Sequence, residues 1–250
     1  MFQTVFKVVL ATLFFSVLAL AKESLVVSIL PQKTLLDAIV GDKIATEVMV
    51  GSGQNPHTYE PKPSQMSSLA NAKIYFSIGI EFEEVWLPKF ADLNKKMAIV
   101  NSSKGIEKIP MVEHKHEEDH DHDHEEHHDH EHGSLDPHVW LTPQNAKIIA
   151  KNMYDKVLLI DKENATFYKN NYETLIVKLD ALDSEIKKKL SHLPPHSKFM
   201  VFHPSWGYFA KDYNLLQLPV EVEGKSPKAK DIANLIEQAK NSEVKVIFAQ

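Results

Sequence analysis

The chain has 250 residues and a formal net charge of −6, with no cysteine and no arginine, so that all 28 basic residues are lysine. The lack of cysteine excludes disulfides, a thiolate metal site and an acylated cysteine that would tether the chain to a membrane. Lysine lacks the rigid fork that suits phosphates and guanine, so this acidic chain is not expected to bind nucleic acid.

The first 21 residues have the pattern of a secretory signal peptide. Lys7 supplies a positive charge, residues 8–20 are almost wholly apolar, and residues 19–21 form a small-x-small cleavage site. No later stretch is long and apolar enough to span a bilayer. We therefore expect export to a periplasm and a mature chain that begins at Lys22 and is not embedded in the membrane.

Short apolar runs alternate with amphipathic stretches between residues 22 and 160. This order of strands and helices predicts an N-terminal α/β lobe, in which helices cover a parallel sheet. The expected strands are 25–30, 44–50, 73–78 and 97–100, and the expected helices are 32–40, 64–72 and 81–93.

A run of nine histidines and ten carboxylates interrupts this lobe between Glu113 and His132. The run has no apolar residue to offset its ordering entropy, so we expect a solvated, disordered loop over residues 113–133. Imidazole and carboxylate groups together are suitable ligands for Zn²⁺, Cu²⁺ and Ni²⁺. The alternative is an acidic linker that only keeps the chain soluble, but such a linker does not need imidazole. The histidines expected to bind metal loosely are His114, His116, His120, His122, His124, His127, His128, His130 and His132.

Two helices are expected after the loop. Thr142 and Pro143 supply an N-cap and a first-turn proline for a helix that runs to about Leu159. The linking segment 161–192 then predicts one helix of roughly 45 Å, a strut between two lobes. A coiled-coil dimer is the alternative, but the heptad register holds for only about three repeats, and we expect a monomer. The apolar positions of the strut are Tyr168, Tyr172, Leu175, Leu179, Leu182, Ile186 and Leu190.

A second series of strands and helices occupies residues 193–250 and predicts a C-terminal α/β lobe. The series ends on a strand without a covering helix, so we expect this lobe to be incomplete. The fold class is therefore α/β, with two doubly wound lobes joined by a long rigid helix. The expected strands are 198–202, 215–220 and 244–249, and the expected helices are 205–211 and 227–240, the latter capped by Ser226.

Three solitary histidines, His57, His138 and His203, each lie beside a proline in a loop. Ligands of open parallel sheets bind beyond the carboxyl ends of the strands, and a neighbouring proline fixes the direction of the backbone. We therefore expect the three imidazoles to share one tight metal site, although a lone histidine can also be a surface or hydrogen-bonded core residue. His192 and His196, which flank a proline pair, are interpreted as helix-end and linker residues.

Four aromatic residues lie close in sequence to these three histidines. They are expected to pack in the core and to form an apolar surrounding for the metal site, and the two roles are compatible. The four residues are Tyr59, Trp140, Trp206 and Tyr208.

Three segments carry a family resemblance: PHTYEP at 56–61, DPHVWLTP at 136–143 and FHPSWGYF at 202–209. They resemble the signature motifs of the periplasmic metal-binding proteins of zinc and manganese ABC importers, and the acidic histidine loop is typical of zinc-specific members. The resemblance implies two α/β lobes joined by a backbone helix, with the metal held between them. It also implies His57, His138 and His203 as ligands and a membrane permease as partner.

Two departures from the family pattern bear on the metal. Manganese members usually have a carboxylate where His203 stands, so a third imidazole favours zinc. Members often take a fourth ligand from a later aspartate, which lies beyond this sequence, so water or Glu60 is expected to complete the site. The predicted function is capture of Zn²⁺ and its delivery to an ABC-type zinc importer, without catalysis. The alternatives are a zinc-dependent hydrolase, a zinc buffer or adhesin, and a manganese-binding protein.

Overall fold

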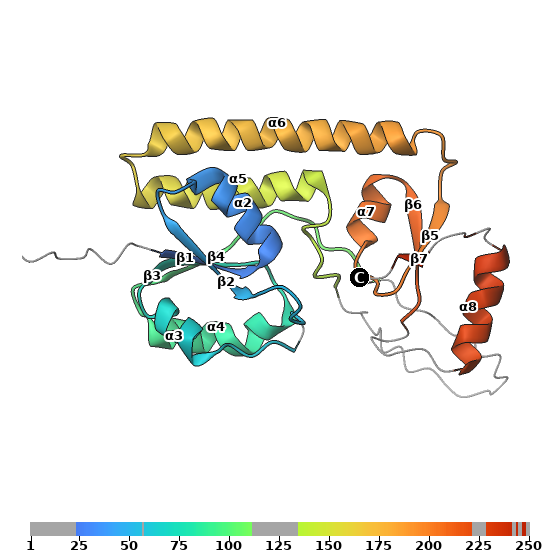
Figure 1. Ribbon diagram of the computed structural model, residues 1–250, viewed down its shortest axis with the longest axis horizontal. Coiled ribbons are helices and arrows are strands. Elements are labelled where there is room, and N and C mark those ends of the chain that lie inside the picture. The colour runs from blue at the N-terminus through green and yellow to red at the C-terminus, as the bar shows by residue number, and fades with distance from the viewer. Residues whose placement is uncertain are drawn as a thin grey trace, which may run out of the picture.

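The computed structural model of the chain describes residues 24–56, 58–111, 135–221, 229–241, 244 and 247–248. The expected signal peptide, His57 and the whole histidine-rich run lie outside these residues. Within the described part, two separate parallel sheets form the centres of two α/β lobes, joined by a long helix (Figure 1). The predicted fold class is confirmed.

The first sheet has the strand order β2-β1-β3-β4, with every pairing parallel. All six residues of β1 are buried, because this central strand has a neighbour on each side and helices above and below. The edge strand β4 is the most exposed. The strands are β1 (Ser24–Ile29), β2 (Ala45–Val50), β3 (Ala72–Ser77) and β4 (Ala98–Asn101).

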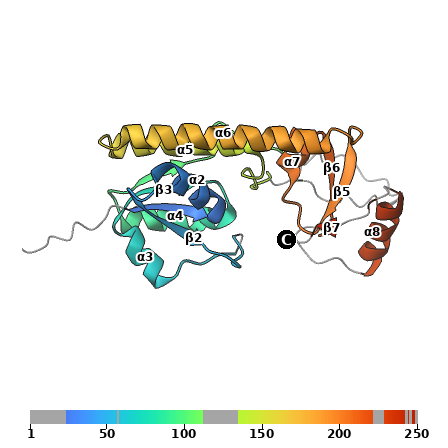
Figure 2. The same cartoon turned by 45° about the horizontal axis from the view of Figure 1, so that its top comes forward.

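Helices cover both faces of this sheet: α2 and α5 lie on one face, and α3 and α4 on the other (Figures 1 and 2). The predicted N-cap of α5 is confirmed, since the Thr142 side chain accepts a hydrogen bond from the Asn145 backbone N–H. The helices are α2 (Leu30–Val40), α3 (Pro63–Leu69), α4 (Glu81–Leu93) and α5 (Pro143–Ile160).

One boundary prediction in this lobe is wrong. The helix expected over 64–72 ends at Leu69, and Ala72 already begins β3. The Asn94 side-chain amide donates hydrogen bonds to the carbonyls of Leu69 and Ala72, at 2.9 Å each. These bonds satisfy carbonyl groups at the end of α3 and the start of β3, and they hold the chain at the turn into the strand.

Helix α6 (Ala165–Leu190) has 26 residues and is therefore about 39 Å long. It runs along α5 and continues beyond it to the second lobe (Figures 1 and 2). Tyr172 stacks on Tyr154 of α5 with ring centroids 4.4 Å apart, and the Asn171 amide donates to the Ile39 carbonyl at the end of α2. The predicted strut is thus a single helix fixed along the first lobe.

The middle of α6 differs from its predicted apolar stripe. Leu182 is 45% exposed, whereas the neighbouring Asp183 is 8% exposed. The Asp183 carboxylate accepts hydrogen bonds from Gln144 of α5 at 3.0 Å, from Lys187 at 2.7 Å and from Tyr213 of the second lobe at 2.9 Å. Polar groups from three elements meet here, so a carboxylate occupies the inward position that periodicity assigned to leucine.

Asp183→Asn is expected to lower the free energy of unfolding at pH 7, and this loss should shrink in acid. The hydrogen bond from Lys187 holds the pKa of Asp183 below its ordinary 3.8, against the opposing effect of burial. The charged form therefore stabilises the fold above about pH 4, and this contribution disappears as the pH falls through the folded-state pKa. Urea unfolding of both proteins at neutral and acid pH measures the difference.

The matched control is Asp155→Asn, which removes an exposed i,i+4 partner of Lys151 on α5 and should change stability little at any pH. An Asp183→Asn loss of equal size in neutral and acid solution would mean that packing, and not charge, stabilises the contact.

The second sheet has the parallel order β6-β5-β7. Its elements are β5 (Ser197–Val201), α7 (Gly207–Asp212), β6 (Leu215–Pro219), α8 (Ala229–Asn241) and β7 (Ile247–Phe248). His196 begins this lobe with a positive φ of 62°, and its backbone N–H donates to the Asn214 carbonyl. Both His192 and His196 are exposed, as expected for linker positions.

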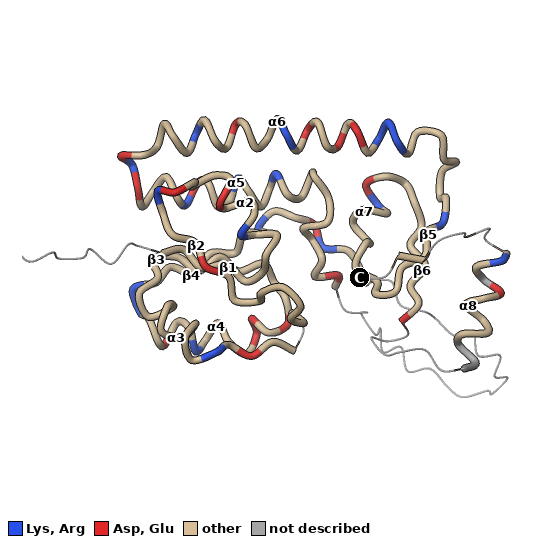
Figure 3. Tube along the Cα trace, viewed as in Figure 1, with Lys and Arg blue, Asp and Glu red and all other residues tan. Residues whose placement is uncertain are grey.

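Charged residues of both signs recur along the length of α6 (Figure 3). Several form i,i+4 pairs on its exposed surface, such as Glu185 with Lys189 at 2.8 Å, and such solvent-screened pairs contribute little to stability. In the part of the chain that the structure describes, no helix combines the length and apolarity needed to cross a membrane.

Candidate metal centre

His138 and His203 reach the same place from different lobes. His138 lies in the segment between the first sheet and α5, and the residues on either side of it, Pro137 and Val139, are buried. His203 lies two residues beyond the carboxyl end of β5, in the turn that leads to α7. The site therefore forms at the carboxyl end of a parallel sheet, where such sheets bind ligands.

The two imidazoles face each other through their Nε2 atoms, which lie 3.3 Å apart. Their ring centroids are 5.0 Å apart and the rings are inclined by 76°. The side chain of His138 is 5% exposed and that of His203 is 25% exposed. One imidazole is thus buried in the interior and the other lies nearer the surface.

Asp136 contacts His138 twice. Its Oδ1 accepts hydrogen bonds from the His138 backbone N–H and from His138 Nδ1, both at 2.8 Å. The other carboxylate oxygen, Oδ2, is buried and has no hydrogen-bond partner among the described residues. A Cβ at Gly207 would lie 2.5 Å from this oxygen, so the start of α7 approaches Asp136 as closely as only glycine permits.

Glu221 contacts His203 in the same manner, with Oε2 2.6 Å from Nδ1. The register of β5 and β6 explains this pair. Val201 is paired with Pro219, so two residues further along each strand His203 comes to lie opposite Glu221. The Glu221 backbone N–H also donates to the Phe202 carbonyl at 3.0 Å, which holds the two strand ends together.

Sequence reasoning missed both carboxylates. Asp136 could have been found, because it precedes His138 by two residues in a turn closed with a proline. Glu221 had no local signal, since it follows His203 by 18 residues and meets it only through the pairing of the strands.

The remaining predicted ligands are not brought to this pair in the described residues. Glu60 is exposed, and no group of three histidine or acidic side chains suited to a metal occurs in the part of the chain that the structure describes. His57 and the nine histidines of the loop lie outside that part. The full ligand set therefore stays a prediction.

The four predicted aromatic neighbours have different roles. Trp140 packs against His138 with ring centroids 5.3 Å apart, and the Tyr208 hydroxyl donates to the Asp136 carbonyl at 2.9 Å. Burial raises the pKa of Tyr208 to about 12, so this hydroxyl remains a donor at neutral pH. Tyr59 instead packs edge-on against Phe82 in the first lobe. Trp206 packs against Phe209 of α7.

The spacing of the two Nε2 atoms fits a shared zinc ion. Two nitrogens bound at about 2.0–2.1 Å to a tetrahedral zinc lie about 3.3–3.4 Å apart, and the observed separation is 3.3 Å. Imidazole nitrogen is a ligand that zinc accepts readily, whereas manganese prefers carboxylate, carbonyl and water oxygens.

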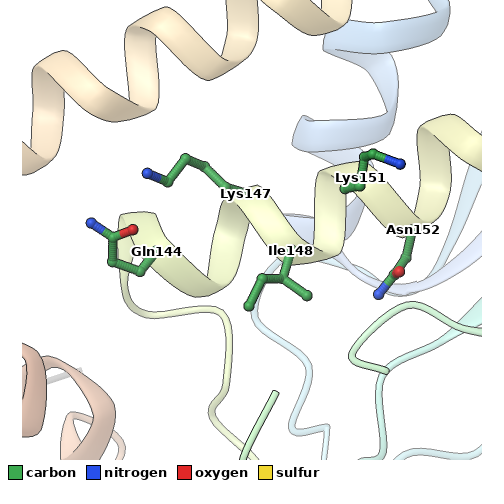
Figure 4. Close-up of a pocket in the computed structure, with 5 residues that line it drawn as sticks. All are labelled: Gln144, Lys147, Ile148, Lys151 and Asn152. Carbon is green, nitrogen blue, oxygen red and sulfur yellow. The ribbon is translucent and has the colours of Figure 1, made fainter. Parts of the chain in front are cut away.

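An open depression of about 330 Å³ lies elsewhere, along α5 (Figure 4). Its lining residues are Gln144, Lys147, Ile148, Lys151 and Asn152. Gln144 and Lys147 donate hydrogen bonds to carboxylates of α6. Lys151 bonds to a carboxylate of α5, and Asn152 bonds to backbone carbonyls after β4. These side chains hold the helices and the loop together. The depression therefore lies over a structural contact between elements and contains neither histidine of the candidate site.

Residues 25–250 match the family model described as ZnuA, zinc-uptake complex component A, periplasmic. The chain belongs to this family. The zinc uptake protein ZnuA of Bacillus subtilis strain 168 is 33% identical over 231 residues, which are 91% of this chain and 70% of that protein. The manganese ABC transporter substrate-binding lipoprotein PsaA of Streptococcus anginosus is 30% identical over 224 residues, 85% of this chain and 67% of that protein.

The same family supplies similar solved structures. A crystal structure of ZnuA superposes with a TM-score of 0.77 at 36% identity and covers 91% of this chain and 82% of that one. Members of the ZnuA family are metal-binding substrate-binding components of ABC importers that work outside the cytoplasm, and they are not enzymes. The alternative of a zinc-dependent hydrolase is therefore wrong. As a substrate-binding component, the chain has a membrane permease as its expected partner.

Proposed function

We propose that the chain captures Zn²⁺ in the periplasm and delivers it to the permease of an ABC-type zinc importer. The observation that carries this proposal is the 3.3 Å separation of Nε2 atoms on two histidines from different lobes. His57 is the proposed third ligand, because it lies beside Pro56 in a motif of the same family. Water completes the tetrahedron, with Glu60, three residues after His57, as the second choice.

Zinc is proposed over manganese because of the donor type. Two imidazoles occupy the described part of the site, and the two carboxylates next to them contact Nδ1 atoms rather than the space beyond Nε2. Manganese would find few oxygen ligands in such a site, whereas three nitrogens and one oxygen are an ordinary zinc set. The zinc relative from Bacillus subtilis, at 33% identity, supports the same choice, although a manganese relative is 30% identical.

A competition titration tests the choice of metal. Protein purified without added metal and stripped with a chelator is titrated with Zn²⁺ and with Mn²⁺ against the same indicator. Zinc is expected to bind at least a hundredfold more tightly, a difference of about 2.8 kcal/mol. Equal or tighter binding of manganese would overturn the proposal of a zinc importer. The alternative, a manganese importer, would then be favoured.

The run from Glu113 to His132 is proposed to bind additional zinc loosely and to feed the tight site. Deletion of this run is expected to lower the number of zinc ions bound per protein while leaving the tight event and the thermal melt nearly unchanged. The reason is that a segment without apolar residues contributes ligands but no packing. Isothermal titration of both proteins measures the number and affinity of the sites.

The control for this deletion replaces the same residues with a serine–glycine linker of equal length, which keeps the connection and removes the imidazoles. If either variant loses the tight event, the loop supplies ligands to the main site and the proposed division of roles is wrong.

The exported protein is proposed to act as a monomer. The inward residues Tyr172, Leu175 and Leu179 of α6 are already packed against the first lobe, so this helix has no continuous apolar seam for a second copy. Light scattering at micromolar concentration should give the mass of one chain, and a dimer would overturn this point.

A zinc buffer or adhesin, which needs no permease, would be favoured if no permease and ATPase genes accompanied the gene.

A further inference from the structure

We propose that Asp136 and Glu221 are positioning residues of the metal centre, each fixing one histidine so that its Nε2 is the ligand atom. The inference rests on the proposed function, because it assigns roles around the same metal. Both carboxylates contact the Nδ1 of their histidine, at 2.8 Å for Asp136 and 2.6 Å for Glu221.

The two contacts determine which ring nitrogen carries the proton. A carboxylate is an acceptor, so the Nδ1 atom that faces it must be the donor. In a neutral imidazole the other nitrogen, Nε2, then carries the lone pair. Both lone pairs therefore lie on the Nε2 atoms of His138 and His203, which face each other across 3.3 Å. Two lone pairs at this distance repel each other unless a proton or a metal ion lies between them, and the carboxylates thus leave both Nε2 atoms able to bind a metal.

Asp136 is held rigidly enough to impose this orientation. Its side chain is 1% exposed. Its backbone N–H donates to the Ile109 carbonyl at 2.8 Å, and its own carbonyl accepts from the Tyr208 hydroxyl at 2.9 Å. Tyr208 belongs to α7, so the residue that orients His138 is also bonded to the lobe that carries His203. An orienting group works only when its own position is fixed, and these contacts fix it.

Glu221 is held in place differently, by backbone hydrogen bonds at the end of the second sheet. The backbone N–H groups of Val220 and Glu221 both donate to the Phe202 carbonyl, at 3.2 and 3.0 Å. The carboxylate is 17% exposed, so it is partly shielded from water without being enclosed. A substitution at Glu221 can therefore change the orientation of His203 without opening a cavity in the core.

The carboxylates also supply charge that the imidazoles lack. Neutral imidazole ligands leave the +2 charge of a bound zinc uncompensated, and two carboxylates behind them would balance it. Hydrogen bonds from ligand Nδ1 to a carboxylate also raise the basicity of Nε2, and the loss of such a partner commonly weakens metal binding 10- to 100-fold.

Substitution at Glu221 is the decisive test. Glu221→Ala is expected to weaken zinc binding 10- to 100-fold in the competition assay with the whole mature chain. Glu221→Gln keeps an acceptor for Nδ1 and should recover part of this loss. Glu107→Ala is the matched control, because it removes an equal charge from an exposed carboxylate paired with Lys211 of α7. This control should bind zinc within twofold of wild type.

The second readout is the protonation pattern of the metal-free protein. Nitrogen-15 NMR at about pH 8 should show His203 with its proton on Nδ1 in wild type and a shift toward Nε2 in Glu221→Ala. A merely structural role of Glu221 would leave this pattern unchanged. Asp136→Asn, which keeps an acceptor and the buried volume, extends the test to His138.

The outcomes separate this inference from the proposed function. If wild type binds zinc tightly and Glu221→Ala binds equally well with an unchanged proton position, the positioning role is wrong and the zinc site stands. If wild type itself fails to bind zinc tightly, the proposed function is wrong. Weaker zinc binding together with a moved proton supports the positioning role.

Discussion

Replacement of His138 or His203 with alanine is expected to weaken zinc binding at least tenfold, and replacement of both should abolish the tight event. In the proposed site each imidazole supplies one inner ligand, and the two Nε2 atoms lie 3.3 Å apart. Loss of an inner ligand removes more than the about 1.4 kcal/mol that a tenfold change represents. His57→Ala should have an effect of the same size. Competition with a chelator of known affinity measures these changes.

His192→Ala is the control for these variants, because His192 is exposed near the end of α6 and belongs to no proposed site. It should bind zinc as wild type does. Unchanged melting temperatures without metal would show that the variants are folded. If the double variant of His138 and His203 retains tight zinc, the site has been assigned to the wrong residues.

Gln32→Leu is expected to lower the free energy of unfolding by about 3 kcal/mol or more. Gln32 is 0% exposed. Its Oε1 accepts from the backbone N–H groups of Ser28 and Ile29, and its Nε2 donates to the carbonyls of Phe76 and Ser77 and to the Ser102 hydroxyl. Leucine fills the space but leaves several buried polar groups without partners, each costing about 1–3 kcal/mol.

Urea unfolding of the metal-free proteins measures this loss. Gln144→Leu is the control, since Gln144 is half-buried and its side chain donates a hydrogen bond to Asp183; this variant should lose about 1 kcal/mol. A Gln32→Leu protein as stable as wild type would mean that the buried backbone groups left by Gln32 find other partners.

Much of the fold could be predicted from hydrophobic periodicity. Helix α4 has the expected bounds, and every expected strand of the first lobe is present within two residues. Periodicity succeeds there because each element buries one continuous apolar face or run. It fails at Leu182 and Asp183, where α6 faces polar side chains of α5 and of Tyr213, the residue after α7, rather than the core.

The candidate site was less accessible to sequence reasoning. Proline-flanked histidines pointed to His138 and His203, and the structure places both at one location, while their role as ligands stays a prediction. The contact between Glu221 and His203 depends on the register of two parallel strands, which no local pattern encodes. Gln32 was equally hidden, because a polar residue near the start of an amphipathic helix gives no sign of the five groups that it bonds.

Helix α6 has a consequence for how a transporter would recognise this protein. Its unbroken 26 residues contact α2 and α5 of one lobe and, through Asp183, Tyr213 of the other. A rod fixed at both ends resists wide swinging of the lobes, so the loaded and empty proteins would have nearly the same radius of gyration in solution scattering. The permease would then have to distinguish metal-bound protein from metal-free protein by the local surface around the histidines, because the overall shape of the protein would be nearly the same in both states.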